Sequence, residues 1–140
     1  MNMSEDKCVI IINETMPSGI IANTSAILGI SLGKILPHIV GKEVNDKDGN
    51  VHNGIIEFPV PILKSDKNKL NEIRNKLFSE EFNELTTIDF TTLAQACKTY
   101  EEYIEKMKHS NKNDLEYIGI AICGDKKKVN KLSGNLPLLR

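Results

Sequence analysis

Asp89 is the carboxylate best placed to do chemistry. It lies near the carboxyl end of the strand-like segment 85–90, and two hydroxyl side chains, Thr91 and Thr92, follow at once. An aspartate beside hydroxyl groups at a strand end can orient a water molecule or a substrate hydroxyl. It can equally cap a helix that begins near Leu93. The sequence supports both interpretations.

His52 is the second residue that could carry a proton. It follows the turn-forming segment 45–50 in a polar setting, and a free imidazole titrates close to neutral pH. The alternative is an ordinary surface histidine. We assign proton handling to Asp89 and His52 as a hypothesis, which requires the two side chains to lie close together.

A polar loop at residues 13–19 separates an apolar run from an apolar, helix-like segment. Ligands in open α/β sheets favour the carboxyl ends of strands, and a helix N-terminus attracts anions through its free N–H groups. We therefore predict a pocket in which Gly19 permits close backbone approach and in which Asn23 and Thr92 orient the ligand. The alternative is a capped helix whose polar side chains bond to backbone or water.

Metal and cofactor sites are not expected. No His-x-x-x-His, Glu-x-x-His or paired-cysteine spacing is present, and such spacings are typical of metal ligands. Of the three cysteines, Cys8 and Cys123 lie in apolar runs and are predicted to be buried thiols, while Cys97 lies in a helical pattern. The segment 45–50 carries the asparagine, aspartate and glycine residues typical of a hairpin turn.

The elements that position these residues are those of one α/β domain over residues 1–140. Residues 7–13 and 117–123 are short, β-branched apolar runs that suit strands buried on both faces. Residues 20–36 predict a buried helix. Residues 54–63 predict an edge strand or an irregular extended segment because of Pro59 and Pro61.

Apolar spacing predicts two further helices, one after Ser65 and one over 93–107, with Thr91 or Thr92 as the cap of the second. A short helix after Gly124 ends at Gly134, and the apolar segment 136–140 docks on the body.

The charge balance disfavours nucleic-acid and membrane-surface partners. The chain has 140 residues and a net charge of −1, whereas such proteins usually carry a strong basic excess. The weakly charged stretch 19–40 is broken by polar residues and a proline, which does not suit a membrane span. We see no signal peptide and predict a cytoplasmic protein.

Several motifs together resemble a known bacterial family. They are Gly-Ile-Ile-Ala-Asn at 19–23, Leu-Gly-Lys-Ile-Leu-Pro at 32–37, Val-Gly at 40–41, His-Asn-Gly at 52–54, Pro-Val-Pro-Ile-Leu at 59–63, Tyr-Glu-Glu-Tyr at 100–103 and Val-Asn-Lys-Leu-Ser-Gly-Asn-Leu-Pro-Leu-Leu at 129–139. The chain resembles the domain of unknown function called DUF-two-thousand over nearly its whole length. The resemblance implies a fold similar to type II peptidyl-tRNA hydrolases: a three-layer α/β/α domain on a mixed, mostly parallel sheet of four strands. It implies no established activity.

The hydrolase pattern is matched only in part. Three residues fall in step with its first-helix motif: Met16, Gly19 and Ala22. Ile20, however, stands where the hydrolases carry a functional lysine. Asp89 takes the place of their aspartate, while Leu93 takes the place of their threonine and Thr92 is one residue away. Loss of a lysine that positions a phosphate-bearing substrate should weaken binding and catalysis together.

Three function hypotheses follow. The first is a domain that binds an unidentified small molecule, with or without catalysis, through Gly19, Asn23, His52, Asp89 and Thr92. The second is residual hydrolysis of peptidyl-tRNA, with Asp89 positioning water. The third is a non-catalytic interaction module that forms a homodimer through the apolar residues 136–139.

Overall fold

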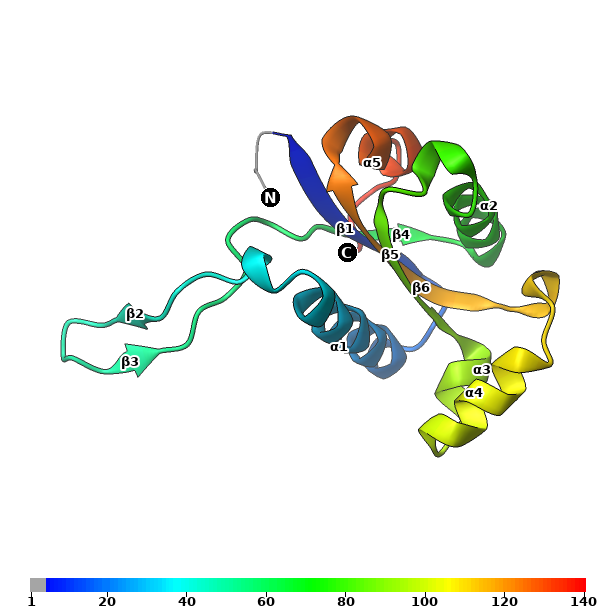
Figure 1. Cartoon of the computed structure of the whole chain (residues 1–140), viewed down its shortest axis with the longest axis horizontal. Helices are drawn as coiled ribbons and strands as arrows, with labels where there is room; N and C mark the ends of the chain where they lie inside the picture. The colour runs from blue at the N-terminus through cyan, green and yellow to red at the C-terminus, as the bar shows by residue number, and fades with distance from the viewer. Residues whose placement is uncertain (1–4) are drawn as a thin grey trace.

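A four-stranded mixed sheet forms the centre of the molecule. The computed structural model describes residues 5–140, and its strand order is β4 (Ile62–Ser65), β1 (Asp6–Asn13), β6 (Tyr117–Asp125), β5 (Thr86–Thr91) (Figure 1). β1 pairs parallel with β4, whereas β1–β6 and β5–β6 are antiparallel. The expectation of a mostly parallel sheet is therefore wrong. Both predicted central strands are confirmed, but burial on both faces does not by itself fix strand direction.

Helices cover both faces of the sheet. Helix α1 (Ser18–Ile35) lies on one face, and helices α2 (Lys67–Leu77) and α5 (Lys126–Ser133) lie on the other (Figure 1). The predicted stripe of α2 is confirmed, since Leu70, Ile73 and Leu77 are all buried. The cap of α2 is Asp66, whose side chain accepts from Lys69 N at 2.8 Å, and not Ser65. The domain has three layers, as expected.

Helix α1 has the predicted span but not the predicted burial. It buries only Thr24, Leu28 and Leu32, while Ile30 is 74% exposed. Where it crosses β6, a Cβ on Gly119 would lie 2.8 Å from side-chain atoms of both Ile12 and Thr24, so this glycine permits the close approach. Among the described residues, α1 is the one helix long and apolar enough to cross a membrane by length and composition. A core helix of a water-soluble domain passes the same test.

A two-stranded arm projects from the body between α1 and β4 (Figure 1). We call residues 40–57 the arm. Its strands β2 (Val44–Asn45) and β3 (Val51–His52) pair antiparallel. The ladder continues toward the body, where Gly41 N donates to Ile55 O at 2.8 Å. The turn lies at the predicted place, with Gly49 at φ 85°. The short helical turn η1 (Pro37–Ile39) joins the arm to α1.

The helix predicted over 93–107 is in fact two helices. Helix α3 (Thr92–Ala96) ends before Cys97, and α4 (Tyr100–Lys108) begins after Thr99. Thr99 Oγ1 accepts from Glu102 N at 3.1 Å, and the Glu102 carboxylate accepts from Lys98 N at 3.1 Å. Thr99 thus caps α4, while Glu102 bonds to the residue before the cap and not to the cap itself, as it would in a standard capping box. Thr91, one of the two predicted caps, does cap α3.

Cys8 and Cys123 are joined as a disulfide and are not the thiols that were expected. They face each other across the β1–β6 pair, and both are almost completely buried. Each lies in its own apolar run, so only the register of two strands that are far apart in sequence brings them together. Cys97 is free and partly buried.

Residues 136–140 dock on the body, as predicted. They run along the outer edge of β4, where Lys64 N donates to Pro137 O at 2.9 Å and Leu139 N donates to Ile62 O at 2.8 Å. Leu136 also packs against the core beneath α2 and α5. The tail therefore covers the β4 edge of the sheet.

Candidate functional site

A cavity of about 410 Å³ lies beside the edge strand β5, between α1 and the α3–α4 segment. Its apolar walls are Ile27, Ile88, Phe90 and Ala94. Its polar side chains include Ser31, Asp89, Thr99 and Tyr103. This size and this mixture suit a small molecule held by apolar contacts and oriented by a few polar groups.

Asp89 brings a charge to this cavity, and Arg74 holds it in place. Arg74 Nε donates to Asp89 Oδ2 at 2.7 Å, and the two side chains are only 14% and 17% exposed. The Arg74 guanidinium also lies 3.9 Å above the centre of the Phe78 ring. A charge-assisted hydrogen bond of this kind is stronger than one between neutral groups and fixes the position of the carboxylate. Within residues 5–140, Arg74 is the hydrogen-bond partner found for this carboxylate, and the bond is made to Oδ2.

Two phenols share the environment of this carboxylate. Burial raises the pKa of Tyr103, and the negative charge of Asp89 raises it further. The pKa of Tyr117 is raised by the same two causes, in the same order, while Arg74 acts in the opposite direction. Both phenols therefore keep their protons at neutral pH and can donate hydrogen bonds.

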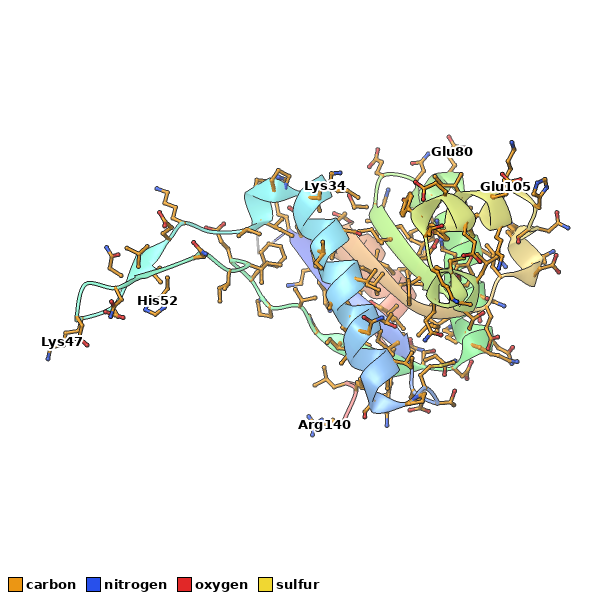
Figure 2. All side chains as sticks on the ribbon, turned by 90° about the horizontal axis from the view of Figure 1, so that it is seen from below. Lys34, Lys47, His52, Glu80, Glu105 and Arg140 are labelled. Carbon is orange, nitrogen blue, oxygen red and sulfur yellow. A yellow bond between two sulfur atoms is a disulfide. The ribbon has the colours of Figure 1, made fainter. Side chains whose placement is uncertain are left out.

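The other four residues of the predicted site do not line this cavity. Thr92 is the first residue of α3, and its backbone N donates to Glu116 O at 3.0 Å. Gly19 and Asn23 are exposed in the first turns of α1. His52 lies on the arm, 2.8 Å from Asp46. Figure 2 places His52 on the opposite side of the molecule from Glu105 of α4, the helix that carries Tyr103.

His52 and Asp46 instead form a local pair that supports the turn of the arm. The Asp46 carboxylate also accepts from the backbone of Asp48 at 2.9 Å and of Asn50 at 3.0 Å. The hydrogen bonds from His52 and from Asn50 hold the pKa of Asp46 below its usual value. The arrangement accounts for both residues as turn structure, and the arm holds them away from Asp89.

The predicted hollow at the start of α1 exists, with other side chains than those expected. A concavity of about 480 Å³ lies there, where β1 and β4 end side by side. Glu14 and Lys64 contribute an ion pair of 3.7 Å, and Arg140 lies at the rim (Figure 2). These charges are much more exposed than Asp89, at 47% for Glu14 and 36% for Lys64. The cavity at Asp89 is therefore the stronger candidate.

Sequence reasoning missed Arg74 and Tyr103. Arg74 is one of only two arginines in a lysine-rich chain, and arginine is the residue preferred for partly buried ion pairs. The rarity of arginine in this chain could have identified Arg74 as a residue of interest, but it could not have identified Asp89 as its partner. Tyr103 was missed because a single helix over 93–107 gives no reason to expect that its side chain lies near Asp89.

No metal centre is found in the described part of the chain: it holds no group of three or more His, Cys, Asp or Glu side chains placed to bind an ion.

Comparisons with known proteins agree on a family and a fold. A family model described as "Protein of unknown function (DUF2000)" matches residues 6–140. The solved structure of Atu0240, a protein of unknown function from Agrobacterium tumefaciens strain C58, is similar with a TM-score of 0.85 at 20% identity. The alignment covers 96% of this chain and 97% of that one. At this identity the likeness shows the fold alone. No curated protein matches.

Proposed function

The chain belongs to the DUF2000 family of proteins of unknown function, and from this starting point we propose that it binds a small molecule in the cavity beside β5. One observation carries this proposal: Asp89, whose side chain is 17% exposed and accepts a hydrogen bond from Arg74, is among the residues that line a cavity of about 410 Å³. No hydrogen bond to the other oxygen, Oδ1, is found within residues 5–140, so a ligand donor can bond to it.

The lining defines the chemical class of this ligand. It is a compact, largely apolar molecule that carries a hydroxyl or amine group. The apolar part packs on Ile27, Ile88 and Phe90, and the donor bonds to Asp89. Tyr103 offers a second polar contact through a phenol that stays protonated. Asp89 serves here to hold the ligand in position, because its negative charge is already paired with the positive charge of Arg74.

A fragment screen by ligand-observed NMR tests this proposal. Hits with a hydroxyl or amine donor should lose at least about tenfold in affinity in Asp89→Asn, a loss typical of a charge-assisted hydrogen bond. Glu105→Gln is the matched control, because Glu105 is exposed on α4 outside the lining. Ala94→Leu, which fills the cavity without touching the ion pair, should abolish binding. Hits that bind both variants normally would contradict the proposal.

Ester hydrolysis on a scaffold like that of type II peptidyl-tRNA hydrolases is the second candidate. The mixed four-stranded sheet and the place of Asp89 on β5 favour it. Ile20 supplies no cation at the start of α1, and Arg74 holds the carboxylate that would have to position water. We therefore place this activity second.

We also propose a cytoplasmic location, which the Cys8–Cys123 pair makes testable. Disulfides are rare in reducing compartments, so the Cys8–Cys123 bond weighs against this location unless the two cysteines are reduced in cells. If thiols are alkylated at the moment of lysis, a cytoplasmic protein should carry the label on all three cysteines. Complete protection of Cys8 and Cys123 in cells would contradict this location.

A further inference from the structure

Helix α1 carries a face that nothing in the described chain covers. Its members are small residues spaced alternately by three and four positions: Gly19, Ala22, Ala26, Gly29 and Gly33. A Cβ added at any of the three glycines would meet nothing within 4 Å. Ile30, 74% exposed, borders this face. Figure 2 shows α1 in front of the sheet with no other element over it.

The arm is a second uncovered apolar element. Val44 and Val51 are each 60% exposed, Val40 is 44% exposed, and Ile55 is 79% exposed. A two-stranded hairpin is at best marginally stable in water without a surface to pack on. The backbones at its base are nevertheless closely joined, since a Cβ on Gly54 would lie 1.8 Å from Gly41 O. The arm is thus a formed structure in which Val44, Val51 and Ile55 have no surface to pack on within residues 5–140.

The exposed surface of the whole chain is larger than its mass predicts. It amounts to 8871 Å² for a chain of 15.6 kDa. A compact monomer of that mass exposes about 7,250 Å² by the scaling of surface with mass. The difference, about 1,600 Å², is about twice what each partner buries in an interface of standard size. This excess equals the total surface that an interface of standard size buries, and the projecting arm contributes to it.

We propose that a second copy of this chain covers both elements. The α1 face packs against the α1 face of its partner across a two-fold axis, and each arm lies along the other copy. A two-fold axis brings the same patch of two subunits together, so the patch must not repel itself. Lys34 is the one charged residue of α1, and the small side chains permit close approach of two helices.

The arm follows α1 in the chain through the short turn η1, so one partner molecule can contact both elements. Residues 136–139 do not provide this dimer contact, because their backbone is already engaged by β4 of their own chain; Leu139 only lines the same hollow as Ala22 at the start of α1. The dimer contact is also independent of the cavity at Asp89, so that failure of either proposal leaves the other standing.

Mass measured by light scattering after size exclusion tests the proposal. The wild-type chain at micromolar concentration should show twice the mass of one chain. Ala26→Glu places a charge at the centre of the α1 face and should give one chain's mass with unchanged circular dichroism, since Ala26 is exposed within a single chain. Ala96→Glu, an exposed alanine on α3, is the matched control and should remain a dimer.

Two further variants test the geometry. In a Cys97→Ser background, Ala26→Cys should form a disulfide-linked dimer on mild oxidation. Replacing residues 43–53 by a short Asn-Gly turn should raise the dimer dissociation constant at least tenfold. A single-chain mass for the wild type, or a dimer that survives Ala26→Glu, would overturn the proposal. So would a monomer that binds phospholipid vesicles in a manner lost in Ala26→Glu, because a lipid surface would then be the occupant of this face.

Discussion

Arg74 and Asp89 lie on different elements and meet at the edge of the sheet, with 2.7 Å between Nε and Oδ2. Arg74 comes from α2 and Asp89 from the middle of β5. The pair therefore joins the helix layer on one face to the edge strand. It also holds a carboxylate at the cavity wall. The same two side chains are therefore expected to affect both the stability of the fold and the binding of a ligand.

Breaking this pair should destabilise the fold. Asp89→Leu and Arg74→Met should each cost about 2–4 kcal/mol, because each leaves the other charge in partial burial without its partner. The double variant should cost clearly less than the two single costs added together. Urea unfolding followed by circular dichroism measures this, with Glu72→Gln as the control. Glu72 pairs with Lys76 at the exposed surface, where a loss below about 1 kcal/mol is expected. Additive costs would show that the two residues act independently.

The tyrosines should titrate late. The pKa values of Tyr103 and Tyr117 are raised above the usual value of 10.0 by burial and by Asp89. A raised pKa contributes stability that is fully present below pH 10 and is lost as the pH rises through the folded-state pKa. With three tyrosines and no tryptophan, absorbance at the tyrosinate band reports these groups directly. Asp89→Asn should lower both pKa values, and Glu105→Gln should leave them unchanged. Two normal titrations in the folded protein would contradict this prediction.

Peptidyl-tRNA should not be turned over. Ile20 offers no positive charge to a phosphate-bearing substrate, and Asp89 is bound to Arg74. The measurement is release of the amino-acid moiety from an N-blocked aminoacyl-tRNA at stoichiometric protein, with Asp89→Ala as the control. Turnover that disappears in Asp89→Ala would reverse the order of the two proposed functions.

One cysteine in three should react in the purified, oxidised protein. Under denaturing conditions without reductant, alkylation should label Cys97 alone, and all three cysteines after reduction. The Cys8–Cys123 bond closes a loop with a sequence separation of 115, for which chain entropy gives a stabilisation of roughly 4–5 kcal/mol. Cys8→Ala should therefore lower the urea midpoint of the oxidised protein. Three labelled cysteines without reductant would contradict the bond.

Local patterns predicted the elements well, because their causes are local. The apolar runs of β1 and β6, the stripe of α2 and the turn of the arm all follow from residues that are close in sequence. The break between α3 and α4 was missed although a signal was present. Thr99 and Glu102 have the Thr-x-x-Glu spacing that is typical of a helix start, and Thr99 does cap α4. The apolar spacing of four and three continues across this point, however, and suggested one helix.

The site was less predictable, because its causes are long-range. Asp89 was identified, but its partner depends on how α2 crosses the sheet toward β5. His52 was grouped with Asp89 on residue type alone. His52 lies in β3 of the projecting arm, however, whereas Asp89 lies in β5 of the central sheet. The disulfide likewise depends on a register between strands that are far apart in sequence.

The pairing of β1 with β6 also affects the order of folding during synthesis. Residues 6–12 align with residues 119–125, so β1 leaves the ribosome long before its antiparallel neighbour is made. Until then the apolar segment 8–12 has no strand on that side, and unpaired strand edges of this kind favour aggregation. Helix α1 is the next element made and needs no distant partner to form. Early docking of α1 on β1 would cover one face of the nascent strand. The helix would then reduce the risk of aggregation before the sheet is complete.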